Sequence, residues 1–246
     1  MRALTPRDAY RRLLARFGAQ GWWPVTPPGG SVPRYRPGCF RPPDSAQAAE
    51  VCIGAILTQN TAWSNVEKAL AALHAARAAD LRRILRVPRA RLERWIRPSG
   101  YYSQKAFKLR CFAAHVLGRA RPLRSWLRDT PLPALREELL SIHGIGPETA
   151  DSILLYAGGR PVFVVDAYTR RIGSRVGWFP EASSYDRIQR FFVARLPRSV
   201  RLYNECHALL VALAKARCRK KPSCPGCPLA AGCRTGRRGV SHETAA

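Results

Sequence analysis

The most informative segment of the sequence is Leu140-Ser141-Ile142-His143-Gly144-Ile145-Gly146-Pro147-Glu148-Thr149-Ala150-Asp151. Gly144 and Gly146 bracket a tight turn, because glycine readily adopts the backbone angles that such a turn needs. Pro147 suits the first position of a new helix, and the negative charges of Glu148 and Asp151 favour its start. The stretch therefore predicts a helix, a Gly-x-Gly hairpin and a second helix. Backbone N–H groups at the start of that helix are suited to hold an anion such as a DNA phosphate.

The charge balance favours a polyanionic partner. The 246 residues include 42 Lys and Arg against 16 Asp and Glu, which gives a formal net charge of +26. Such an excess attracts nucleic acids and makes their binding salt-dependent. A GC-rich coding bias would explain why Arg predominates over Lys, but not why acidic residues are few. A Gly-x-Gly turn also occurs in ordinary helical packing, yet beside this charge it favours a nucleic-acid-binding protein.

Helical periodicity dominates the chain, and strand patterns are almost absent. The length allows one large or two small domains, and 46% hydrophobic residues can build a core. There is no apolar run of the roughly eighteen residues that a membrane span needs, and the Arg-rich N-terminus lacks the apolar core of a signal peptide. We therefore expect a cytoplasmic protein, associated with the nucleoid in a prokaryote. The predicted helices cover residues 5–18, 46–58, 63–76, 79–86, 89–96, 102–118, 134–142, 147–157, 167–178, 184–195 and 201–217.

Four of the eight cysteines occur in one short segment near the C-terminus. They follow the pattern C-x5-C-x2-C-x5-C and are Cys218, Cys224, Cys227 and Cys233. Four cysteines this close together can surround one metal centre. Disulfides are the alternative, but a chain without a signal peptide is expected in a reducing compartment. Zinc prefers paired C-x2-C knuckles, whereas this segment has a single C-x2-C flanked by two longer arms.

Three features together resemble the endonuclease III superfamily of helix-hairpin-helix DNA glycosylases. They are the hairpin, the four-cysteine segment and the stretch Val164-Val165-Asp166-Ala167-Tyr168-Thr169-Arg170-Arg171. The resemblance extends from Thr5 to Cys233 and leaves out a Pro- and Gly-rich insertion at 27–43 and the last dozen residues. The first arm of the cysteine pattern is one residue shorter than in endonuclease III.

The resemblance implies an all-α fold with two helical lobes. Residues 45–159 would form a six-helix barrel that carries the hairpin at about 134–157. Residues 1–44, an N-terminal helix and a Pro-rich loop, would pack with a C-terminal lobe at 160–246, where the four cysteines hold a [4Fe–4S] cluster; zinc is the less favoured group. Double-stranded DNA containing damaged bases would lie across the cleft, and the protein, as a monomer, would turn the target nucleotide out of the duplex.

The resemblance also assigns the chemistry. Asp166 matches the family's catalytic aspartate, whose carboxylate stabilises the cationic sugar as the base leaves and helps a water molecule attack it. A helix N-cap is the other role open to Asp166, and the two are compatible. Bifunctional members place a lysine nucleophile two residues after the second glycine of the hairpin. Here that position is Glu148, which cannot form an imine, so a monofunctional glycosylase of base-excision repair is expected.

The aromatic residues near the N-terminus indicate the substrate. Trp22-Trp23-Pro24, with Trp63 after Gln59-Asn60-Thr61-Ala62, is similar to the 3-methyladenine DNA glycosylase III branch, in which an aromatic pair and a proline sandwich the flipped purine. Alkylation gives the purine positive charge, which favours cation–π stacking on indole. Lys215 falls where that branch has a pocket lysine, although a solvated or phosphate-binding lysine fits equally well. A glycosylase for oxidised pyrimidines or mismatched bases, and a non-catalytic DNA-damage-binding protein, are the alternatives.

Further residues are expected to contact DNA. Gln59 and Tyr101 match the family positions that fill the hole left by the flipped base: Gln59 in the vacated stack, Tyr101 as a wedge in the opposite strand. A helix C-cap and a core aromatic are their alternative roles. The remaining expected contacts are Asn60, Lys105, Lys108, Gly144, Ile145, Gly146, Arg170 and Arg171.

Overall fold

The computed structural model of the protein describes residues 3–39 and 44–237. Within these ranges every regular element is a helix, and β-pairing is limited to an isolated antiparallel bridge between Val25 and Arg34. The all-α prediction is confirmed. Residues 40–43, the end of the predicted insertion at 27–43, lie outside the described part of the chain. None of the helices described is long and apolar enough to cross a membrane.

The chain divides into two compact units. We call residues 3–22, 37–39 and 163–237 the terminal unit, and residues 23–36 and 44–162 the central unit. The chain passes from one unit to the other between Trp22 and Trp23. The N-terminal segment 1–44, expected as one piece, is therefore shared between the two units.

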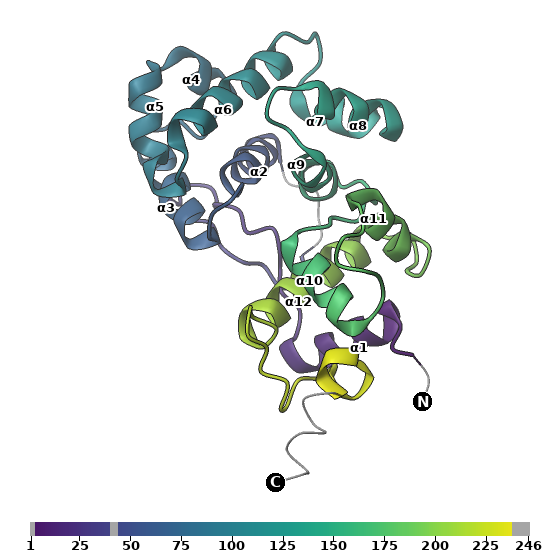
Figure 1. Cartoon of the computed structure of the whole chain (residues 1–246). Helices are drawn as coiled ribbons and strands as arrows, with labels where there is room; N and C mark the ends of the chain where they lie inside the picture. Colours follow the sequence, from purple (N-terminus) through teal and green to yellow (C-terminus); the bar gives the residue numbers. More distant parts are fainter. Residues whose placement is uncertain (1–2, 40–43, 238–246) are drawn as a thin grey trace. The chain divides into compact units, whose positions relative to one another are not determined.

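The terminal unit is built on its longest helix, α12, which packs against α1 and α10 (Figure 1). Its aromatic core stacks Phe163 on Phe192, with ring centroids 4.2 Å apart and the edge of Phe163 against Tyr203. The Trp178 indole donates a hydrogen bond to the Leu4 carbonyl at 2.6 Å, which ties the start of the chain to this core. The helices are α1 (Pro6–Phe17), α10 (Ala167–Val176), α11 (Tyr185–Val193), α12 (Val200–Ala216) and the 3-10 turn η3 (Ala230–Gly232).

The central unit surrounds one apolar helix, α2. Residues 48–57 of α2 are all buried, and the helix contacts α3, α6, α7, α9 and η2 (Figure 1). A helix that is apolar all round belongs in a core, which is where this unit places it. The helices are α2 (Ser45–Leu57), α3 (Trp63–Ala75), α4 (Leu81–Arg86), α5 (Arg89–Ile96), α6 (Tyr102–Leu117), α7 (Leu123–Asp129), α8 (Leu132–Ser141) and α9 (Pro147–Ser152), with the 3-10 turn η1 (Arg97–Ser99) and the π-helical turn η2 (Ile153–Ala157).

Two elements differ from the helices predicted from periodicity. Helix α7 was not expected, although Leu123, Trp126 and Leu127 repeat at i, i+3 and i+4 and are buried. The helix predicted over 147–157 is α-helical only as far as Ser152. It continues as η2, a wider turn in which the Gly158 N–H bonds to the Ile153 carbonyl at 3.0 Å.

Candidate functional site

The hairpin joins α8 to α9 in the central unit. Gly144 has a φ of +82°, in the left-handed region that favours glycine. A Cβ at this position would lie 2.4 Å from Cγ of Lys108, so the lysine stem also excludes a side chain. Ile145 anchors the turn in the core, while Gly146 and Pro147 are exposed at the start of α9. The hairpin thus presents the beginning of a helix to solvent, where the backbone dipole favours an anion.

A hydrogen-bond network fixes the orientation of Gln59 against the hairpin. Its amide nitrogen donates to the Gly144 carbonyl and to Oγ1 of Thr149, both at 3.0 Å. The Lys108 ammonium donates to its amide oxygen at 2.6 Å. The amide nitrogen must donate and the amide oxygen must accept, so only one orientation of the Gln59 side chain satisfies all three hydrogen bonds.

Asn60 and Tyr101 are exposed residues of the central unit with left-handed backbone. Their φ angles are +53° and +45°, which asparagine adopts readily but which is unusual for a bulky residue such as tyrosine. Tyr101 precedes α6 and is 65% exposed, an uncommon setting for a large aromatic ring. A strained, exposed position of this kind is typical of residues that contact a ligand.

Lys105 was expected to contact a DNA phosphate, and the structure places it elsewhere. Its side chain is only 1% exposed, and its ammonium donates to the carbonyls of Leu57 and Ser99 at 2.8 and 2.6 Å. Burial, with a smaller effect of Lys108, lowers its pKa to about 8. Lys105 therefore joins α2 to the turn before α6 and does not present its charge to solvent.

An aromatic cluster forms inside the central unit around Trp23. The Trp63 ring meets Trp23 edge-on at 5.2 Å, and the Tyr156 ring lies 5.3 Å away at 50°. Gly54 leaves room for the Trp23 indole, which comes within 3.1 Å of the position of a Cβ there. Trp23 is half-buried, whereas Trp63 and Tyr156 are buried. Trp23 is therefore the most exposed ring of this cluster.

Sequence reasoning missed the residues that hold the Trp23 loop. Glu50, buried in α2, accepts hydrogen bonds from the backbone N–H and hydroxyl of Thr26 at 2.9 and 3.0 Å. His74 of α3 contacts the other carboxylate oxygen at 2.9 Å. One signal was available, because Glu50 is the single charged residue in the apolar run from 48 to 57. A buried charge requires partners, and here they fix the segment that follows Trp23.

The remaining residues that were expected in the base pocket belong to different units. Pro24 is buried in the central unit. Trp22 and Lys215 belong to the terminal unit, where Trp22 is half-buried and Lys215 is exposed in the last turn of α12. Just before Trp22, the Gln20 N–H donates to the buried Glu205 carboxylate of α12 at 2.6 Å.

Asp166 is the N-cap of α10 in the terminal unit. One carboxylate oxygen accepts the Thr169 N–H at 2.6 Å, and the other lies 3.5 Å from Nε2 of His207 on α12. Burial by itself would raise the pKa of Asp166, but His207 and the bond from Thr169 lower it below its usual value. The geometry thus keeps a largely buried carboxylate ionised, which is the state needed to stabilise a nearby cation.

Arg170 and Arg171, also expected to contact phosphates, are engaged within the terminal unit. The Arg170 guanidinium donates to the carbonyls of Glu181 and Ser183. The Arg171 Nε donates to the Cys218 carbonyl at 3.0 Å, and its guanidinium lies over the Tyr168 ring. Both side chains hold neighbouring segments to α10.

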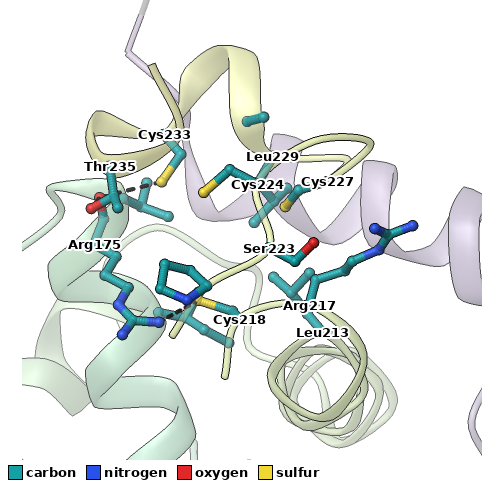
Figure 2. A pocket seen from close by; sticks show the side chains of 15 residues that line it. Arg175, Leu213, Arg217, Cys218, Ser223, Cys224, Cys227, Leu229, Cys233 and Thr235 are labelled. Carbon is teal, nitrogen blue, oxygen red and sulfur yellow. Dashed lines mark hydrogen bonds between the residues drawn. The ribbon is translucent and has the colours of Figure 1, made fainter. Parts of the chain in front are cut away.

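The four C-terminal cysteines line one pocket of the terminal unit. Figure 2 shows Cys218, Cys224, Cys227 and Cys233 around it, with Arg175 at its edge. The Arg175 guanidinium lies 3.3 Å from Sγ of Cys218, and its carbonyl accepts the Cys233 thiol at 3.3 Å. Among the residues described, no three His, Cys, Asp or Glu side chains are drawn together tightly enough to hold a single metal ion. The four thiols therefore share a pocket without converging on one point.

Comparison with known proteins identifies the family. The profile of the HhH-GPD superfamily of base excision DNA repair proteins matches residues 53–198. The Methanocaldococcus jannaschii protein MJ1434, provisionally named a DNA repair glycosylase, is 42% identical over 223 residues, which cover 89% of this chain and 91% of that protein. The Helicobacter pylori 3-methyladenine DNA glycosylase MagIII, solved with 1,N6-ethenoadenine, superposes with a TM-score of 0.67 at 27% identity, over 86% of this chain and 98% of its own.

The fold itself is that of endonuclease III. A trapped covalent complex of endonuclease III with DNA superposes with a TM-score of 0.73 at 21% identity, covering 96% of this chain and 99% of that one. The profile match, the relative that is 42% identical over most of both chains, and the shared helical fold agree. The chain therefore belongs to the HhH-GPD superfamily of base excision DNA repair proteins.

Proposed function

We propose that the protein is a monofunctional DNA glycosylase that releases alkylated purines such as 3-methyladenine from double-stranded DNA. The observation that carries this proposal is Asp166, a largely buried carboxylate kept ionised by His207 and Thr169. Breaking an N-glycosidic bond leaves positive charge on the sugar, and a preorganised negative group stabilises that charge. The Asp166 carboxylate would also accept a proton from the attacking water.

The aromatic cluster supports alkylated purines as the substrate class. Trp23 offers a half-buried indole braced by two buried rings and by the Glu50–Thr26 bonds. An alkylated purine carries positive charge, so an indole face binds it more strongly than it binds an undamaged base. Alkylation also weakens the glycosidic bond, so one carboxylate suffices for its cleavage. The similarity to MagIII, solved with a modified adenine, agrees with this class.

The hairpin supports hydrolysis without strand cleavage. Glu148 is exposed in the first turn of α9, at the position where bifunctional relatives carry the lysine nucleophile. A carboxylate cannot form a Schiff base with the sugar, so the hairpin supplies no lyase nucleophile. We assign the hairpin to phosphate binding, through the exposed start of α9 at Gly146.

The four-cysteine pocket fits a [4Fe–4S] cluster. Four thiols from a segment of sixteen residues line one pocket, together with apolar side chains that include Ile172 and Leu213. Each cysteine of such a cluster binds its own iron, so the thiols surround the group from separate sides. When bound, the cluster would hold the segment 218–233 in a fixed conformation against α10. Arg171 and Arg175 already bond to the backbone of that segment.

A panel of damaged duplexes tests the proposal. Free bases released from 3-methyladenine, 7-methylguanine, thymine glycol and uracil duplexes are separated by chromatography, with Asp166→Asn as the inactive control. Release of the two methylated purines alone supports the proposed substrate class. Release of thymine glycol or uracil would assign the protein to oxidised pyrimidines or mismatched bases. Tight binding without release of any base would make it a DNA-damage-binding protein.

A further inference from the structure

A strongly basic surface lies on α4, α5 and the turn η1 of the central unit. Between positions 82 and 97 the chain carries seven arginines and a single acidic residue, Glu93. All seven arginines are exposed. We call this surface the arginine face; its members are Arg82, Arg83, Arg86, Arg89, Arg91, Arg94 and Arg97.

The positive charges of the arginine face repel one another. Arg82 in the first turn of α4 and Arg89 in the first turn of α5 also oppose the helix dipole, whereas Arg83, Arg86 and Arg94 lie in last turns, where the dipole favours positive charge. Arg82 and Arg86 are four residues apart, and further pairs are three apart, so like charges face each other along each helix. Asp80 caps α4 and offsets part of this repulsion. In the described part of the chain, Arg89 of this face forms an ion pair with Glu93.

A general excess of arginine does not explain this arrangement. A coding bias toward arginine would fill exposed positions evenly, and it would not concentrate seven arginines between positions 82 and 97. A polyanion bound along the surface would remove the repulsion, because each phosphate neutralises a nearby guanidinium. The charge pattern therefore points to a partner with regularly spaced negative charges.

The arginine face is continuous with Tyr101. The Arg97 guanidinium lies 5.8 Å from the centre of the Tyr102 ring, and Arg89 donates to the Ser103 hydroxyl at 2.7 Å. Both contacts reach the first turn of α6, directly after the exposed and strained Tyr101. A duplex that meets Tyr101 would have its backbone next to these arginines.

We propose that the arginine face binds the phosphate backbone of the duplex that flanks the damaged base on the Tyr101 side. This inference rests on the proposed function, since it takes Tyr101 as a DNA-contacting residue. Phosphate contacts carry no sequence information, so the surface would add affinity for any duplex and leave bond cleavage unchanged. It would let the protein hold undamaged DNA while it moves along it.

Salt dependence of DNA binding tests the inference with the full-length protein. A triple variant, Arg82→Gln, Arg86→Gln and Arg94→Gln, removes three charges from the arginine face. A matched control, Arg7→Gln, Arg11→Gln and Arg12→Gln, removes three exposed charges from α1. Fluorescence anisotropy measures binding to a long undamaged duplex and to a short damaged one, over roughly 50 to 200 mM salt. Base release is measured in single turnover with saturating enzyme.

The expected results separate the two proposals. The face variant should bind the long undamaged duplex roughly tenfold or more weakly, and its log–log salt slope should fall by about two to three. The α1 control should match the wild type, and base release at saturation should stay within twofold for both. An unchanged slope, or an equal loss in the α1 control, would overturn the inference. Failure of the wild type to release any base would count against the proposed function alone, because the undamaged-duplex measurement does not depend on it.

Discussion

Replacing Asp166 with asparagine separates the two roles of this residue. The carboxylate caps α10 through the Thr169 N–H at 2.6 Å, and it supplies negative charge beside His207. The asparagine amide oxygen can accept the same hydrogen bond, and Asn and Asp are about equally good N-caps. The cap itself should therefore be retained, and the loss of stability at neutral pH should be limited to the contribution of the lowered pKa of Asp166. The charge, by contrast, is removed completely.

The loss of charge should appear in the chemical step. Removing one preorganised electrostatic contact typically lowers a rate about 10²–10³-fold, or about 2.7–4 kcal/mol. We expect a loss of at least that size in single-turnover release of 3-methyladenine, with duplex binding close to that of the wild type. Asp44→Asn is the matched control, because Asp44 caps α2 through the Gln47 N–H at 2.8 Å and has no proposed part in catalysis.

Two outcomes would refute the reasoning. A loss of only a few-fold in Asp166→Asn would show that Asp166 is a helix cap and that another group stabilises the sugar cation. A large loss in a variant that is partly unfolded at the assay temperature, while Asp44→Asn is folded, would show that the substitution acts through folding. Asp166→Ser should reproduce the asparagine result, because serine caps a helix without carrying charge.

Further predictions concern pH, the cysteine segment and the hairpin. Because His207 helps to lower the pKa of Asp166, His207→Ala should shift the acidic limb of the base-release profile to higher pH; an unmoved limb would show that the two side chains are not coupled. The same lowered pKa stabilises the fold above the ordinary aspartate pKa, about 3.9, and this stabilisation should disappear as the pH falls through the lower folded value, as chemical denaturation at several pH values will show. The purified protein should be yellow-brown with roughly four irons per chain, whereas stoichiometric zinc in a colourless protein would replace the cluster assignment. Borohydride should fail to trap the wild-type protein on abasic DNA, and Glu148→Lys should introduce weak strand cleavage; efficient trapping of the wild type would show that another amine is the nucleophile.

Local signals in the sequence were sufficient for much of the fold. Gly144 and Gly146 specify the hairpin within a few residues, and the close spacing of the four cysteines predicts that they share one pocket, as they do. Such features depend on neighbours in sequence, so no knowledge of the tertiary structure is needed to find them. Helix α7 carries a local signal too, in Leu123, Trp126 and Leu127 at i, i+3 and i+4, and this signal was missed.

The errors concern residues whose environment comes from distant segments. Lys105 appeared to be a surface cation, yet the carbonyls of Leu57 and Ser99 receive its ammonium inside the central unit. Helical periodicity places position 105 near the buried positions 106 and 109, but it does not reveal which carbonyls are available there. Glu50 and Thr26, 24 residues apart, escaped notice for the same reason.

The wide turn η2 makes the aromatic cluster depend on the winding of the backbone as well as on the identity of its residues. A regular α-helix advances about 100° per residue, and η2 holds one residue more than an α-helical turn would. If the same five residues, Ile153–Ala157, adopted regular α-helical winding, the side chains at the end of the turn would rotate by up to about that angle. Tyr156 would then turn away from Trp23, now 5.3 Å from it. A change of winding that leaves every residue in place would therefore dismantle the cluster, while conservative substitutions within it preserve its geometry.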